Sequence, residues 1–217
     1  MPSLPHLRDI DGWGHPRFWR TIQVVKLGAK LYVWGRGAVA FHLFSFCTKS
    51  NSWSILPGLY ALGDNAGWSA EQYNDTLQLV VVGHKLYLWG RGRTECVLFS
   101  FDTITSRWVS CIPTSSDTPR TYLPLPDAAG WDRPQHYHTA RVVAIGPIIY
   151  VWVRGMLECQ LHSFDTHTLL WKQLPSLVAF LDQDGWDQPK YYTTIQVRKL
   201  VVYVRHSLGV IASHYAC

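Results

Sequence analysis

Three side chains that can transfer protons or hold an anion occupy equivalent positions in the chain: Arg20, Asp75 and His138. Each directly precedes a threonine, and the fourth residue at this position is Thr193. An imidazole with an unperturbed pKa of about 6.5 can accept a hydroxyl proton. A carboxylate can orient that imidazole, or donate a proton itself if burial keeps it protonated, and a guanidinium can hold an anion. We therefore predict Arg20, Asp75 and His138 as the catalytic residues of one acid–base site.

Aromatic and polar side chains surround this triad in the sequence, and we predict that they bind the substrate. The aromatic ones lie one or two positions earlier: Phe18, Trp19, Tyr73, Tyr137 and Tyr192. The polar ones lie three positions later: Gln23, Gln78, Arg141 and Gln196. Three further cations follow a later apolar run: Arg36, Arg91 and Arg154. The triad position differs in all four copies while the neighbouring threonine does not, which favours a single asymmetric site.

Each of these patterns also has a structural interpretation. The identical threonines and the tryptophans at Trp34 and Trp89 are typical of packing, and the arginines can cap strand ends or stack on aromatic rings. Cys96 and Cys159 share one position, which favours a framework role. His136 and His138 have the spacing of two metal ligands on one strand face, but no third ligand is evident, so we predict no metal site. Divergence at the triad position can also be drift.

The elements that must position these residues come from a fourfold internal repeat. A Gly-Trp pair recurs with intervals of 55, 63 and 55 residues, at Trp13, Trp68, Trp131 and Trp186. Two other markers keep the same rhythm in the first three copies: Leu-Tyr-x-Trp-Gly-Arg-Gly from residue 31, and Phe-Asp-Thr with a tryptophan seven positions after the Phe, as at 101–108, with Cys47 in place of the Asp in the first copy. The fourth copy of the first marker, at 202–207, is degraded. The eight extra residues of the long interval lie near 114–122, where a lid over the site is one interpretation.

Each repeat reads as four short strands, in the first copy at 21–27, 30–35, 41–46 and 53–56, and no helical period is present. We therefore predict an all-β fold, a four-bladed β-propeller of four-stranded antiparallel blades in a single domain, 1–217. The repeats are about 13–67, 68–130, 131–185 and 186–217 plus 1–12. The last pairing is predicted because Pro2-Ser3-Leu4 and the following Gly-Trp match Pro175-Ser176-Leu177 and its Gly-Trp without a gap. An N-terminal strand would thus close the ring and cover its edge.

The composition and the residue patterns argue against several classes of protein. Hydrophobic residues at 47% and charged ones at 16% rule out a disordered chain. The net charge of +5 is spread without a basic run, so no nucleic-acid partner is expected. The N-terminal residues lack a signal-peptide pattern, and no apolar stretch has the length of a membrane helix. Five cysteines without CxxC spacing argue against a disulfide framework. We expect a cytoplasmic monomer with no membrane partner.

Three resemblances follow from these residues. The Leu-Tyr-x-Trp-Gly-Arg-Gly and Phe-Asp-Thr markers resemble kelch blades, with Gly-Arg-Gly in place of the paired glycines. The phrase Gly-Trp-x-x-Pro-x-Tyr-Tyr-x-Thr-Ile-Gln at 185–196 is similar to blades of the PLL-like fucose-binding lectins. A short four-bladed chain with an asymmetric site resembles the hydroalkoxylation cyclases of fungal aromatic polyketide pathways.

These resemblances imply three functions. The first is a cyclase that needs no cofactor and adds a phenol hydroxyl to an alkene in a small aromatic substrate. The second is a glycan-binding lectin, and the third is a kelch-like protein-interaction module. A single axial ligand is expected for the cyclase, and several ligands between blades are expected for the lectin.

Overall fold

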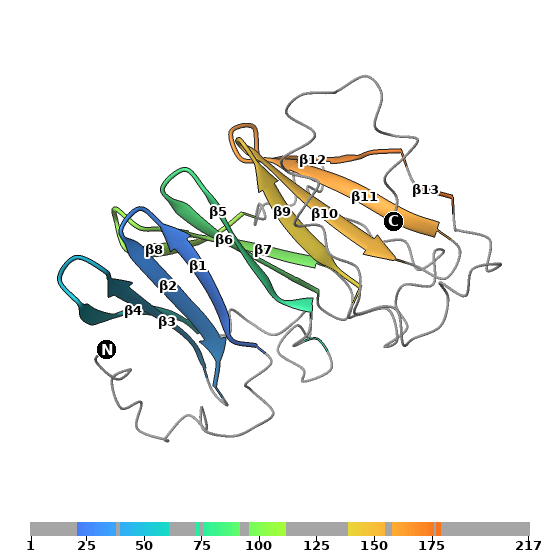
Figure 1. The fold of residues 1–217 in the computed structure, drawn as a ribbon. Coiled ribbons are helices and arrows are strands. Elements are labelled where there is room, and N and C mark those ends of the chain that lie inside the picture. The colour runs from blue at the N-terminus through green and yellow to red at the C-terminus, as the bar shows by residue number, and fades with distance from the viewer. Residues whose placement is uncertain are drawn as a thin grey trace.

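The computed structural model describes residues 21–37, 40–60, 73, 76–91, 96–111, 139–154, 158–175 and 177–178. Apart from the 3₁₀ residues Tyr73 and Thr76, the regular structure within these ranges is strand, arranged in three antiparallel sheets (Figure 1). The predicted N-terminal strand, the fourth repeat, the Gly-Trp markers and the 114–122 segment lie outside the described residues. No helix in the described part of the chain is long and apolar enough to cross a bilayer.

The first sheet has the order β1–β2–β3–β4 and matches the four strands predicted for the first repeat. Its strands are β1 (Gln23–Leu27), β2 (Lys30–Arg36), β3 (Ala40–Cys47) and β4 (Ser52–Tyr60). The last strand is longer than predicted because it continues past a register shift between Phe41 and Leu43. Gly58 lies at this irregularity, where a Cβ would be only 2.5 Å from the Phe41 carbonyl oxygen.

The second and third sheets repeat this layout. The second has the order β5–β6–β7–β8 and the third β9–β10–β11–β12, with β13 pairing to β11. The second sheet contains β5 (Gln78–Val82), β6 (Lys85–Arg91), β7 (Cys96–Asp102) and β8 (Arg107–Ser110). The third contains β9 (Arg141–Ile145), β10 (Ile148–Arg154), β11 (Glu158–Asp165), β12 (Leu170–Gln173) and β13 (Leu177–Val178). The strand pattern predicted from the repeat is therefore confirmed for these three copies.

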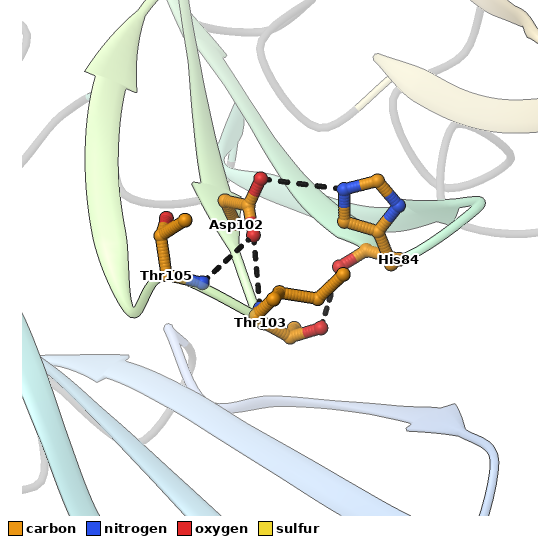
Figure 2. Close-up of polar contacts among 5 residues, drawn as sticks. His84, Asp102, Thr103 and Thr105 are labelled. Atoms are coloured by element: carbon orange, nitrogen blue, oxygen red, sulfur yellow. Dashed lines mark hydrogen bonds and ion pairs between the residues drawn. The ribbon is translucent and has the colours of Figure 1, made fainter.

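The Phe-Asp-Thr marker forms a turn that ties two hairpins of a sheet together (Figure 2). Asp102 Oδ1 accepts hydrogen bonds from the backbone N–H groups of Ile104 and Thr105, at 2.9 and 3.0 Å. The Thr103 hydroxyl donates to the His84 carbonyl oxygen at 2.6 Å, which joins this turn to the β5–β6 turn. That second turn has a glycine, Gly83, at φ 59°, a conformation that side chains with a Cβ disfavour. Equivalent threonine links occur in the first and third sheets.

The sheets pack face to face through apolar side chains, with the first strand of each sheet contacting the first strand of the next (β1 with β5, β5 with β9; Figure 1). Alternate residues of β6 point to opposite faces, because side chains alternate along a strand. Leu86 and Leu88 join the cluster between the first and second sheets, here called the first seam. Tyr87 and Trp89 join the cluster between the second and third sheets, the second seam. This blade-like stacking is propeller-like, as the repeat predicted.

Candidate functional site

A threonine hydroxyl ties the start of the first strand to the end of the second strand in two sheets. The Arg36 backbone N–H donates to Thr21 Oγ1 at 2.9 Å, and the Arg91 backbone N–H donates to Thr76 Oγ1 at 3.0 Å. Both threonines are fully buried. The residues that lead into β1 and β5, Thr21 and Thr76, therefore meet the arginine-ended strands β2 and β6 at one end of these two sheets, here called the mouth. The structural interpretation of the threonines is confirmed.

Among the predicted aromatic site residues, Tyr73 is the one that the structure describes, and it lies beside Thr76. The Thr76 hydroxyl donates to the Tyr73 carbonyl oxygen at 2.7 Å, which fixes the backbone just before β5. Tyr73 itself is buried, at 2% exposure. Its side chain packs inside the protein, and its contact with a substrate stays a prediction.

The mouth arginines lie in different surroundings. The Arg36 guanidinium carbon is 5.7 Å from the centroid of the Phe41 ring, a cation–π geometry, and Phe41 in turn stacks on Trp34 with centroids 5.0 Å apart. Arg91 ends β6 and is only 6% exposed. Arg154 ends β10, as its position in the repeat predicts. The stacking interpretation thus applies to Arg36, with phenylalanine as the ring, and the packing interpretation of Trp34 is confirmed by its complete burial.

The glutamine position has a framework role in the first sheet. Gln23 Nε2 donates to the Leu77 carbonyl oxygen, and Gln23 Oε1 accepts from the Leu79 backbone N–H at 2.7 Å. The side-chain amide therefore pairs with the backbone that enters β5, across the first seam. Substrate contact by Gln23 and Gln78 stays a prediction, but sequence reasoning missed this bridging role.

Arg141 replaces glutamine in the third sheet and bonds locally. Its Nη1 donates to the Ala140 carbonyl oxygen at 2.7 Å, and that oxygen is the equivalent of the Leu77 oxygen held by Gln23. Burial lowers the pKa of the Arg141 guanidinium below its ordinary value.

The remaining predicted site residues lie outside the described residues. They are Arg20, Asp75, His138, Phe18, Trp19, Tyr137, Tyr192 and Gln196. The structure therefore describes the framework of the mouth rather than its predicted acid–base triad, which stays a prediction.

A second concave region was not predicted. A groove of about 460 Å³ lies at the second seam, between β6–β8 and the β11–β12 turn, with Lys85, Tyr87, Asp102, Arg107 and Thr166 among its lining residues. Burial raises the pKa of the Tyr87 phenol. Burial likewise raises the pKa of the Cys111 thiol. The sequence did contain one signal for this groove. Among the three described repeats, only the second has a cation at both positions that pair across strands with the aspartate of the Phe-Asp-Thr marker, namely Lys85 and Arg107.

No protein-family model and no curated protein matches the chain. Among solved structures, it is similar to a prolyl endopeptidase at 14% sequence identity and a TM-score of 0.31, covering 75% of this chain and 31% of that one. It is also similar to the β-propeller domain of Nup133 from Vanderwaltozyma polyspora at 9% identity and a TM-score of 0.34, covering 75% and 48%. The chain thus spans less than half of either structure, and at these TM-scores neither similarity assigns a fold or a function.

Proposed function

We propose that the chain is a four-bladed propeller that closes a ring in a small aromatic molecule by adding a phenol hydroxyl to an alkene. The observation that carries the proposal is the pair of threonine links, which brings the ends of β2 and β6 to the same end as the segments before β1 and β5. Asp75 immediately precedes Thr76 in the chain, and Arg20 immediately precedes Thr21. Cations and titratable groups would then share one mouth.

The proposal includes a fourth blade built from 186–217 together with 1–12, which the matching Pro-Ser-Leu segments support. In a closed ring of four, equivalent positions face one another across the axis. Arg20, Asp75 and His138 would therefore converge on one ligand rather than serve three separate sites.

The proposed chemistry is redox-neutral and conserves all atoms. His138 removes the phenol proton, the phenolate oxygen forms a C–O bond to one alkene carbon, and the other alkene carbon takes up a proton. The imidazolium, a tyrosine, a water molecule or a protonated Asp75 can supply that proton, and Arg20 with the mouth arginines holds the phenolate. Holding the substrate folded removes much of the entropic barrier to ring closure.

The proposal is tested with 2-prenylphenol, a probe that closes to a chroman by this reaction. His138→Ala and Asp75→Asn should each slow product formation by about 10² to 10⁴, the usual contribution of a general acid or base. His167→Ala serves as the matched control, because His167 is exposed in the β11–β12 turn. Turnover at the wild-type rate in both variants, or a wild-type rate no faster than the uncatalysed one, contradicts the proposal.

Glycan binding is the second candidate, and one observation favours it. A tyrosine on the second strand pairs with a serine on the third in every described sheet: Tyr32 with Ser45, Tyr87 with Ser100 and Tyr150 with Ser163. A lectin with one site per blade requires a feature that repeats in this way; because Tyr32, Ser45, Tyr87 and Ser100 are buried, the pairs would support each site from beneath rather than contact the glycan. Titration with fucose that saturates at three or four equivalent sites supports the lectin, whereas a single site or none argues against it.

A further inference from the structure

The groove at the second seam lies far from the mouth. Lys85 begins β6 at the groove and Arg91 ends it at the mouth. Six residue-to-residue steps of extended strand separate them, about 20 Å at roughly 3.3 Å per step. A ligand in the groove would therefore be independent of any ligand at the mouth.

The three described sheets differ in the charges of the two residues that pair across strands with the middle residue of the Phe-Asp-Thr marker. In the second sheet Asp102 pairs across strands with Lys85 on one side and Arg107 on the other, which gives two cations. The equivalent partners of Cys47 in the first sheet are Lys30 and Ser52, which gives one cation. The partners of Asp165 in the third sheet have no charge, since they are Ile148 and Leu170. Among the described sheets, only the second has two cations at this position.

Asp102 does not neutralise these two cations by direct pairing. Its Oδ1 accepts two turn amides, and its Oδ2 lies 3.3 Å from His84 Nε2 on the β5–β6 turn. Neither Lys85 nor Arg107 forms an ion pair with any residue that the structure describes. Their charge is therefore available to an external anion.

The rest of the lining is rich in hydroxyl groups. Five are present: Tyr87, Ser100, Thr105, Ser110 and Thr166. Hydroxyls both donate and accept hydrogen bonds, so they match the hydroxyls of a polyol. Val109, on the same wall and more than half exposed, offers an apolar surface to carbon-bound hydrogens. The groove volume falls within the range of about 300–1,000 Å³ common for small-molecule sites.

We propose that this groove binds a small polyhydroxylated molecule that bears one oxyanion, a carboxylate or a phosphate. Arg107 and Lys85 hold the oxyanion, because guanidinium and ammonium groups form their strongest hydrogen bonds with such groups. The hydroxyls of Ser100 and Thr166, from facing sheets, contact the body of the molecule.

Isothermal titration of the full chain with glucose 6-phosphate, glucuronate and glucose tests this site. At least one anionic probe should bind at one equivalent and about tenfold or more tightly than glucose, as expected for a charge-assisted contact. The tighter of the two anionic probes identifies phosphate or carboxylate as the preferred group. Equal affinity for glucose, or no binding of either anionic probe up to about 10 mM, overturns the proposal.

The variants Arg107→Ser and Lys85→Ile place in the groove the residues that the first and third sheets have at these positions. Each should weaken binding of the anionic probe by about tenfold. Lys26→Ala is the matched control, since Lys26 is an exposed cation on β1, and it should leave the affinity within about twofold. Wild-type affinity in both groove variants, or an equal loss in the control, overturns the proposal. Arg107 is exposed, so Arg107→Ser keeps the test valid if Lys85→Ile does not fold.

Discussion

The two seams use the same repeat positions in different ways. At the first seam, Gln23 pairs with both backbone groups that flank the start of β5, and the Trp108 indole N–H donates to the Pro57 carbonyl oxygen at 2.8 Å. At the second seam, Arg141 takes the equivalent carbonyl oxygen, and Gln78 makes no such bridge within the described part of the chain. The first seam is closed by side-chain-to-backbone bonds, whereas the second opens into a charged groove. Identical strand layouts therefore do not produce identical interfaces.

The second and third sheets also differ in the apolar residue that precedes Gln78 or Arg141 and in the residue that packs against it. In the second sheet the fully buried Leu77 lies over Gly90, where a Cβ would come within 2.5 Å of Leu77 Cδ2. In the third sheet the equivalent residues are Ala140 and Val153, both buried in one cluster. The large side chain lies just before the first strand in the second sheet and on the second strand in the third sheet. The total volume is similar, which is the kind of exchange that cores tolerate.

The largest predicted effect comes from breaking this pairing in the second sheet. Gly90→Val should lower the free energy of unfolding by about 3 kcal/mol, because it overpacks against Leu77. Leu77→Ala alone should cost about 3 kcal/mol through the cavity it leaves. The double variant recreates the Ala140–Val153 pair and should cost clearly less than the two single losses together, a coupling that urea denaturation measures.

Additive losses in the double variant would contradict the compensation between these two positions. Gly83→Ala provides a control for the backbone contribution of glycine, because Gly83 is at φ 59° with no atom near its missing Cβ. It should destabilise through strain alone, by about 1 kcal/mol, and show no coupling to Leu77→Ala.

The next effect concerns the bridge across the first seam. Gln23→Ala should cost about 1–3 kcal/mol, because it leaves the Leu77 carbonyl and the Leu79 amide without their partner. Gln78→Ala is the matched variant at the second seam and should stay within about 0.5 kcal/mol of wild type. Urea denaturation of the two variants gives the comparison directly. Equal losses would show that the two seams are equivalent at this position.

The smallest predicted effect is on the pH dependence of stability. It concerns the turn after the third strand, where the first sheet has Cys47 and the second has Asp102. Hydrogen bonds from the Ser50 hydroxyl and from the Ser50 and Lys49 amides lower the pKa of Cys47 from 9.0 to about 7. A depressed folded-state pKa means that the thiolate stabilises the fold fully above pH 9 and that this gain is lost as the pH falls through about 7. Asp102 also has a lowered pKa, caused first by the Thr105 amide, so its contribution is lost only in acid, below the ordinary aspartate pKa.

Alkylation by iodoacetamide, followed by mass spectrometry of the peptides, checks this prediction. The rate at Cys47 should rise with a midpoint near pH 7, and Cys111, whose pKa burial raises, should react slowly over the same range. Cys47→Asp should remove the dependence of stability on pH between 7 and 9. A midpoint near 9 at Cys47 would contradict the turn geometry.

The repeat predicted the framework well because strands and turns depend on local residue types. The strand ends at Arg36 and Arg91, the glycine turns and the buried tryptophans all follow from short patterns in the sequence. The bridge by Gln23 and the groove at Lys85 were not predictable, because both depend on how two sheets face each other across a seam. The predicted triad of Arg20, Asp75 and His138 lies outside the described residues and keeps its status as a prediction.

The exchange between Leu77–Gly90 and Ala140–Val153 also constrains how the repeats can have diverged. If the copies arose by duplication, one pair was reached from the other through an intermediate with either two large or two small side chains. The first intermediate is strained and the second has a void, and each costs a few kcal/mol, a large fraction of the stability of a typical domain. The two positions can therefore change only together. Relatives of this chain should have a large–small or a small–large pair at each blade, and rarely two large or two small residues.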